Sequence, residues 1–80
     1  MTLLEELAAE SARRTANREA AMRAVRKLLR KGGAPISSRE LVEIVARRAR
    51  VPESAVEVAI SELTIDREVD YDGDNNLFRV

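Results

Sequence analysis

Hydrophobic residues recur every three or four positions along most of this chain, which is the spacing that gathers them on one face of an α-helix. The clearest stretch covers residues 18–31, and two further stretches lie between residues 37 and 65, divided at Val51 and Pro52. We therefore predict three helices. Their buried faces are expected to consist of Ala21, Met22, Val25, Leu28 and Leu29; of Leu41, Val45 and Ala49, flanked by Val42 and Ile44; and of Val56, Ala59, Ile60 and Leu63.

A further helix is predicted at the start of the chain. Thr2 followed three residues later by Glu5 is a capping-box pattern, in which a hydroxyl and a carboxylate satisfy the free amides of a first turn. The apolar face of this helix, which consists mainly of leucines, gives out at Ser11. The pattern leaves open whether the helix breaks near residues 15–17 or continues into residues 18–31.

The ends of the predicted helices are marked by residues with special backbone preferences. The glycine pair at 32–33 is expected to stop the helix of residues 18–31. Pro35 disfavours helical geometry before it, so a short extended piece should follow. Ser37 with Glu40 repeats the capping-box pattern and is expected to open the next helix.

After Leu63 the hydrophobic spacing changes from helical to alternating. Val69 and Tyr71 form one alternating pair, and Leu77 and Val80 continue the pattern beyond a polar turn at residues 72–76. The glycine, aspartates and asparagines of this turn tolerate the left-handed geometry that a hairpin needs. The predicted fold class is therefore mainly α with a small C-terminal β-hairpin.

The same turn carries Asp70, Asp72 and Asp74, whose alternating carboxylates are similar to the start of a calcium-binding loop. Asn75 stands where that loop has glycine, and its closing glutamate would lie past residue 80. These departures favour a plain hairpin turn over a metal site.

The composition narrows the function. The 80 residues are 45% hydrophobic and 35% charged, which is typical of one soluble domain near the lower size limit for a single core. The chain has no cysteine and no histidine, so it lacks disulfides, thiolate metal sites and the commonest general base. We therefore expect a protein that is not an enzyme and that uses no cofactor, metal or small-molecule substrate.

No apolar run approaches the roughly 20 residues that span a bilayer, and the start lacks the basic and apolar regions of a secretory leader. We therefore expect a cytoplasmic protein that makes no membrane contact.

The formal net charge of zero conceals a strong asymmetry along the chain. Residues 1–31 carry eight basic and four acidic side chains, and residues 32–50 carry four and two. Residues 51–80 carry only two basic side chains and eight acidic ones. The N-terminal part is thus basic and the C-terminal part acidic, and a charged partner should distinguish between them.

The order of helix, extended piece, helix, tight turn, helix and hairpin over residues 17–80 resembles the winged helix-turn-helix superfamily. The residues that carry the resemblance lie around the turn: a small Ala46, an apolar Val51, then Val56 and Ala59 at core positions of the third helix. The chain departs from the pattern at Arg50, where the family often has glycine, so the turn could differ or the second helix could be longer.

The resemblance implies a winged-helix domain at residues 17–80 that follows an N-terminal helical extension at residues 1–16. The alternative is an unrelated three-helix bundle with a C-terminal hairpin.

In DNA-binding members of this superfamily, the third helix lies in the major groove and its exposed side chains contact bases. None of the corresponding residues here is arginine, lysine, asparagine or glutamine, which make the usual bidentate base contacts. Two of them are acidic and would face a polyanion. The positions concerned are Glu53, Ser54, Glu57, Val58 and Ser61. Conventional recognition by this helix is therefore not expected.

Two functions remain open. In the first, the chain is a small regulator associated with nucleic acid, and its basic N-terminal half contacts phosphates, which positions a protein without specifying sequence. The candidate residues are Arg23, Arg26, Lys27, Arg30, Arg39, Arg47 and Arg50, with Arg48 beside them. The competing explanation is an ordinary solvated face.

In the second, the chain is a protein-interaction or dimerisation module that does not bind DNA. The third helix carries a second stripe at heptad-like spacing on its outer side, formed by Ser54, Val58, Ser61 and Ile65. We expect this stripe to be covered by the N-terminal leucines, Leu3, Leu4 and Leu7, of the same chain. A second copy of the chain or an external protein partner are the alternatives.

Overall fold

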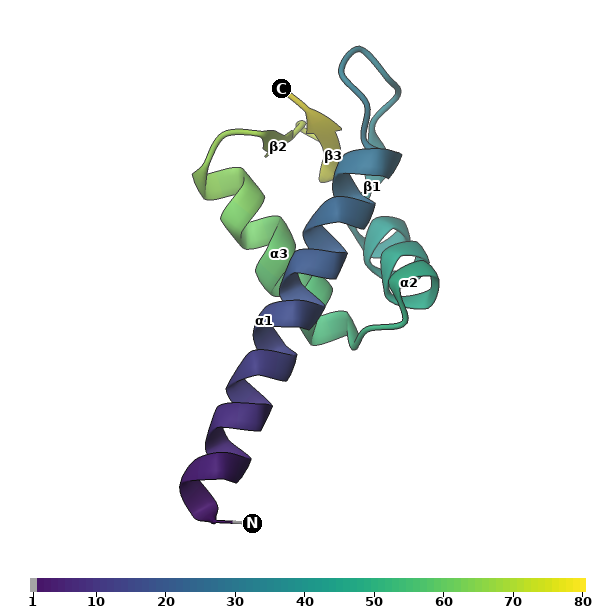
Figure 1. Ribbon diagram of the computed structural model, residues 1–80. Helices are drawn as coiled ribbons and strands as arrows, with labels where there is room; N and C mark the ends of the chain where they lie inside the picture. The colour runs from purple at the N-terminus through teal and green to yellow at the C-terminus, as the bar shows by residue number, and fades with distance from the viewer. Residues whose placement is uncertain (1) are drawn as a thin grey trace.

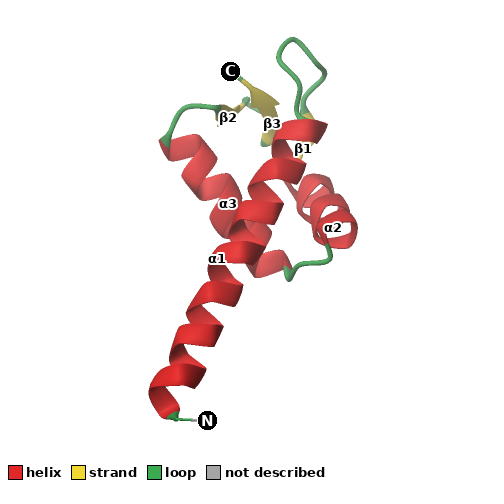
Figure 2. Ribbon diagram, viewed as in Figure 1, coloured by secondary structure: helices red, strands yellow, loops and turns green. Residues whose placement is uncertain are grey.

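The computed structural model describes residues 2–80 and contains three helices and three short strands (Figures 1 and 2). The fold is therefore mainly helical with a small sheet, as the sequence predicts. In chain order the elements are α1 (Leu3–Leu28), β1 (Ile36–Ser37), α2 (Ser38–Ala49), α3 (Glu53–Ile65), β2 (Val69–Tyr71) and β3 (Asn76–Arg79).

The strands form an antiparallel sheet in the order β1-β3-β2. The predicted hairpin is present as β2 and β3, with Val69 opposite Arg79 and Tyr71 opposite Leu77. The extended piece before α2 joins this hairpin as β1, because Ile36 also pairs with Leu77. The sheet thus has one strand more than the hairpin predicted from the sequence.

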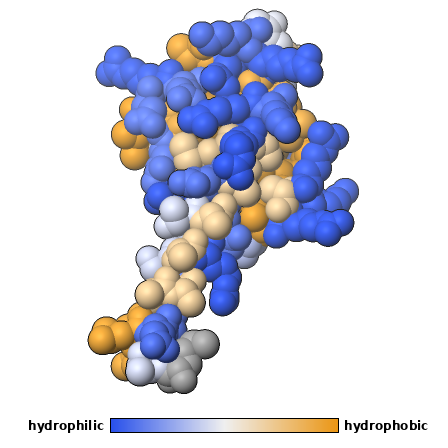
Figure 3. Space-filling model, viewed as in Figure 1, coloured by the Kyte–Doolittle hydropathy of each residue, from blue (hydrophilic) through white to orange (hydrophobic). Residues whose placement is uncertain are grey.

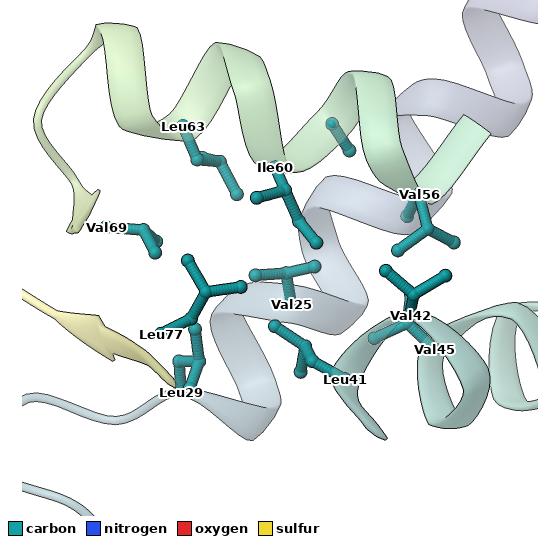
Figure 4. Close-up of a cluster of buried hydrophobic side chains, with 12 residues drawn as sticks. Val25, Leu29, Leu41, Val42, Val45, Val56, Ile60, Leu63, Val69 and Leu77 are labelled. Atoms are coloured by element: carbon teal, nitrogen blue, oxygen red, sulfur yellow. The ribbon is translucent and has the colours of Figure 1, made fainter. Parts of the chain in front are cut away.

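All three helices and the sheet contribute to one buried core (Figure 4). The predicted stripes of α1 and α3 are confirmed, apart from Met22 and Leu28, which are only partly buried. On α2, the predicted Leu41, Val42 and Val45 are buried, whereas Ile44 and Ala49 are only partly buried. The core consists of Ala21, Val25, Leu29, Leu41, Val42, Val45, Val56, Ala59, Ile60, Leu63, Val69 and Leu77.

Two apolar residues of the alternating pattern, Tyr71 and Val80, are exposed. Tyr71 lies at the turn end of β2, where it lines a surface groove, and Val80 follows the last residue of β3. Only one residue of each hairpin strand, Val69 and Leu77, is fully buried. The strands are too short to extend the alternating pattern into the core beyond these two positions.

α1 runs without a break through residues 15–17, which resolves the alternative left open by the sequence. It ends at Leu28 and not at the predicted residue 31. Leu29 leaves the helical conformation (φ −95°, ψ 99°) while its side chain stays in the core, and Gly32 at φ 77° turns the chain back. α1 therefore ends three residues earlier than predicted, at the point where Leu29 turns into the core.

The two predicted capping boxes have different outcomes. At α1 the box is complete, because Thr2 Oγ1 accepts from the Glu5 amide and a Glu5 oxygen accepts from the Thr2 amide, both at 3.2 Å. At α2 the prediction is wrong, because the Ser37 side chain makes no capping hydrogen bond. Ser37 belongs to β1, and the next amide, that of Ser38, donates to the carbonyl of Asn75 in the β2–β3 turn (3.4 Å).

The tight turn between α2 and α3 explains the departure at Arg50. Arg50 adopts the left-handed conformation (φ 55°, ψ 49°) that glycine adopts most easily. The Val51 amide then donates to the Ala46 carbonyl (3.1 Å), which satisfies the end of the helix. Of the two alternatives left open by the sequence, a longer second helix is therefore excluded. α2 ends at Ala49, and Arg50 adopts the left-handed turn conformation in place of glycine.

The turn between β2 and β3 is organised by one carboxylate. Asp72 Oδ1 accepts from the amides of Asp74 (2.9 Å) and Asn76 (3.0 Å), and Asn75 takes a positive φ of 63°. These backbone hydrogen bonds lower the pKa of Asp72. The carboxylate of Asp72 therefore serves the hairpin itself.

No helix within residues 2–80 is long and apolar enough to cross a membrane.

Candidate interaction surfaces

A groove of about 410 Å³ lies between α1 and α2, and we call it the basic groove. Arg23 and Lys27 lie one helical turn apart on α1, and Arg48 faces them from the end of α2. All three side chains are exposed, and none forms an ion pair with another residue in the range 2–80. The remaining lining is apolar and mostly small: Ala20, Ala24, Leu28 and Ala49. The groove thus offers three available cations around a shallow apolar floor.

The other predicted nucleic-acid contacts are not gathered in this groove. Arg30, Arg47 and Arg50 are exposed but do not line it. Arg39 lies 3.6 Å from Glu43 on the far side of α2, in a groove with several carboxylates. The structure therefore brings together two of the seven predicted residues, Arg23 and Lys27, with Arg48, which the sequence placed beside them.

Arg26, another of the predicted phosphate contacts, forms an ion pair within the protein. Its Nε and Nη2 donate to the two carboxylate oxygens of Glu68, at 2.8 and 3.2 Å, across 42 residues of sequence. Arg79 approaches the same carboxylate at 3.8 Å. The hydrogen bond from Arg26 is the main reason that the pKa of Glu68 lies below its ordinary value, and the charges of Arg79 and Lys31 add to it. Arg26 thus links α1 to the start of the hairpin.

A second groove, of about 530 Å³, lies between α2, α3 and the hairpin, and we call it the acidic groove. Glu43 lines it from α2, and Glu53 and Glu57 line it from α3. Ser61 and Tyr71 complete the exposed side, and Arg39 is its single cation among the lining residues. Three of the five positions that base recognition would use on α3 therefore lie in an acidic surface.

The first half of α1 extends away from the rest of the molecule (Figure 1). Every residue from 2 to 16 is exposed, and hydrophobic atoms stand at its free end (Figure 3). Leu4 is 79% exposed and Leu7 is 53% exposed. The expectation that these leucines fold back over the outer stripe of α3 is wrong, because the continuous helix carries them away from α3.

A third groove, of about 460 Å³, lies where α1 leaves the body, and we call it the α1–α3 groove. Its α1 side carries Ser11, Arg14, Thr15, Asn17 and Arg18, and its α3 side carries Pro52, Ser54, Ala55 and Val58. Ser54 and Val58 of the predicted outer stripe therefore face this groove. Ser61 faces the acidic groove, and Ile65 lines neither.

Sequence reasoning missed the contribution of α1 to this third groove. The signal was present, since Leu4, Leu7, Ser11, Arg14 and Arg18 continue backward, at steps of three and four, the same face that carries Ala21 and Val25. The arginines interrupt the apolar run, so the stripe looks as if it ends at Ser11.

Within the part of the chain that the structure describes, no three histidine, cysteine, aspartate or glutamate side chains are placed to hold a metal ion. The three grooves thus offer charged side chains and exposed apolar area to a partner.

No protein-family model, no curated protein and no solved structure matches this chain.

Proposed function

We propose that this chain is a small winged-helix protein that associates with nucleic acid through its basic groove. The order of the elements supports the winged-helix assignment: three helices with β1 between the first two, followed by a hairpin that pairs with β1. The tight left-handed turn at Arg50 between α2 and α3 is a second supporting feature. The domain begins near residue 17, where α1 first becomes partly buried.

The observation that carries the proposal is the convergence of Arg23, Lys27 and Arg48 on one groove without acidic partners. Cations that are already paired within the protein gain little from a phosphate, whereas free ones release counterions when they bind it. The alanine floor of the groove lets a sugar-phosphate backbone approach the helices closely. Phosphate contacts of this kind give affinity and orientation without base recognition.

The acidic groove supports the unusual orientation. A polyanion placed against α3 would meet Glu53 and Glu57, with Glu43 behind them. Like charges brought together at an interface oppose association. We therefore propose that nucleic acid lies on the α1–α2 side and that α3 and the hairpin face away from it.

Fluorescence anisotropy with a short labelled duplex of mixed sequence tests the proposal. Three phosphate contacts predict a slope of roughly −2.7 in a plot of log K against log salt concentration. The variant Arg23→Gln/Lys27→Gln/Arg48→Gln should lose most of the binding at about 50 mM salt and should show a slope near zero.

The matched control is Arg13→Gln/Lys31→Gln/Arg67→Gln, which removes the same charge from exposed cations outside the basic groove that also form no ion pair within residues 2–80. It should retain both the affinity and the salt slope, apart from a small general effect of net charge. Equal losses in the two variants would show that binding follows net charge and not the groove. Undiminished binding by the first variant would reject the basic groove as the site.

A further inference from the structure

The protein exposes more surface than a compact chain of its size. Its radius of gyration is 14.0 Å, against about 12 Å for a compact domain of this length. Its accessible surface is 5733 Å², against about 4,800 Å² for a typical folded monomer of 8.9 kDa. The excess of about 900 Å² is close to the roughly 800 Å² that each partner buries in a specific protein interface.

The first half of α1, residues 3–16, which we call the free half, is exposed throughout and contributes to this excess. It also has an amphipathic face. Leu4, Leu7 and Ser11 lie on the side of α1 that Ala21 and Val25 turn toward the core further along. The face that α3 and α2 cover over the second half of the helix is therefore uncovered over the first half.

The α1–α3 groove lies next to this uncovered face and is suited to receive a helix. Pro52, Ala55 and Val58 provide its apolar side, and Val58 is 48% exposed. Arg14 and Arg18 line the opposite side, where they pair with Glu10 and Glu62 of the same chain. Exposed ion pairs of this kind contribute little to stability, so either arginine can exchange its carboxylate for one from a partner. A fitting partner is thus a helix that carries both apolar and acidic residues.

The first turns of α1 are such a helix. They combine Leu3, Leu4 and Leu7 with Glu5 and Glu6, and residues 3–10 contain no cation. Residues 11–18 have the opposite character, with three arginines and no acidic residue. The two parts of the free half are therefore complementary to each other in charge, but one straight helix cannot fold back on itself.

We propose that two copies of the chain form a symmetric dimer in which the first two turns of each α1 occupy the α1–α3 groove of the other copy. The two α1 helices then run antiparallel, so that residues 3–10 of one copy lie beside residues 11–18 of the other. The two-fold axis passes near Glu10 and Ser11. A parallel pair would instead place acidic turns beside acidic turns and arginines beside arginines, which opposes association.

Each groove is filled by the same segment of the other copy, as a two-fold interface requires. This dimer does not depend on the proposed binding of nucleic acid, because the basic groove lies on another side of α1 and shares no lining residue with the α1–α3 groove.

Sedimentation equilibrium of the full chain tests the association. The wild type should be a dimer, and Leu7→Glu should raise the dissociation constant at least about 100-fold, because the charge enters the symmetric interface twice. Leu7 is exposed in the single chain, so the variant should keep the helical circular dichroism spectrum of the fold. The control Val80→Glu places the same charge on an exposed apolar residue at the far end of the chain and should leave the dimer intact.

Single-cysteine variants test the orientation, since the natural chain has no cysteine to interfere. Ser11 and Thr15 lie one turn apart in the same groove. In the antiparallel dimer Ser11→Cys should form an intermolecular disulfide readily. The two Thr15 positions should lie about 13 Å apart along the axis, beyond disulfide reach.

A chain that stays monomeric up to about 1 mM would overturn the dimer. So would a dimer that Leu7→Glu leaves unchanged. Equally efficient crosslinking of Ser11→Cys and Thr15→Cys would show a parallel pair and overturn the proposed arrangement.

Discussion

At the scale of single residues, Arg50 shows how an arginine occupies a turn position where the superfamily that the sequence resembles often has glycine. The α2–α3 turn needs a residue with positive φ, and Arg50 supplies it at φ 55° despite the steric cost of a side chain there. The sequence marked this position as unusual but could not decide between a different turn and a longer helix. Backbone conformation at one residue depends on how the two helices pack, which local sequence does not reveal.

The Arg50→Gly substitution should therefore stabilise the protein by about 0.5 to 1 kcal/mol, because relief of the left-handed strain outweighs the added freedom of the unfolded chain. Arg47→Gly, the same change inside α2, should instead destabilise it by about 1 kcal/mol. Urea unfolding of both variants measures the difference. A destabilised Arg50→Gly would mean that the arginine side chain contributes contacts that offset its strain.

Glu68 is a residue whose role the sequence could not show, because its partner Arg26 is 42 positions away. The hydrogen bond from Arg26 holds the pKa of Glu68 below its ordinary value. The native state therefore binds fewer protons at this group than the unfolded state. Its contribution to stability is complete above the unfolded pKa of about 4.3 and is lost as the pH falls through the lower, folded pKa.

The free energy of unfolding of Glu68→Gln should accordingly lie below that of the wild type at neutral pH, and the gap should close in acid. Urea unfolding between neutral pH and about pH 3 measures this convergence. Glu19→Gln removes an exposed carboxylate that has no ion pair in the described part of the chain, and it should stay near the wild type at neutral pH. If the difference in unfolding free energy between the wild type and Glu68→Gln grew as the pH fell, the lowered pKa of Glu68 would be contradicted.

At the scale of elements, the helices were the most predictable feature. Periodic apolar spacing identified the core faces of α1 and α3 because those faces pack against neighbours on one side only. The early end of α1 and the missing side-chain cap at Ser37 share a reason. α2 itself begins at Ser38, directly after Ser37, as the sequence predicts. At both places the chain's course is set by tertiary contacts, namely burial of Leu29 and pairing of β1 with β3, which override local capping signals.

A leucine-to-alanine substitution should lower the free energy of unfolding much more on the packed helix α3 than on the exposed free half of α1. Leu63→Ala removes a fully buried side chain from α3 and should cost about 2–5 kcal/mol. Leu4→Ala, on the free half of α1, should cost less than about 0.5 kcal/mol when measured at dilutions where copies are separate. Thermal or urea unfolding compares them, and a large cost for Leu4→Ala under those conditions would show that the leucine is covered within its own chain.

At the scale of the whole molecule, the charge asymmetry of the sequence becomes a separation between surfaces. The basic groove lies between α1 and α2, and the acidic groove lies between α2, α3 and the hairpin. The sequence predicted this polarity correctly in outline. It could not predict which cations stay available, because that depends on pairs such as Arg26–Glu68 and Arg18–Glu62, which form only in the folded chain.

The free half of α1 was correctly predicted as a helix, but the sequence did not show that it extends away from α3. The sequence favoured cover of α3 by the leucines of the same chain. An unbroken helix through residues 15–17 makes that impossible and leaves both apolar surfaces open. Continuity across a stretch without strong breakers is decided by small energies, which the pattern of residues does not resolve.

The most direct test of the proposed function is an NMR titration of the backbone amides with a mixed-sequence DNA duplex at low salt. The proposal predicts shifts concentrated on residues 20–28 and 47–50, with α3 and the hairpin unaffected. Shifts concentrated on residues 53–61, or no shifts at all where electrostatic attraction is strongest, would contradict it.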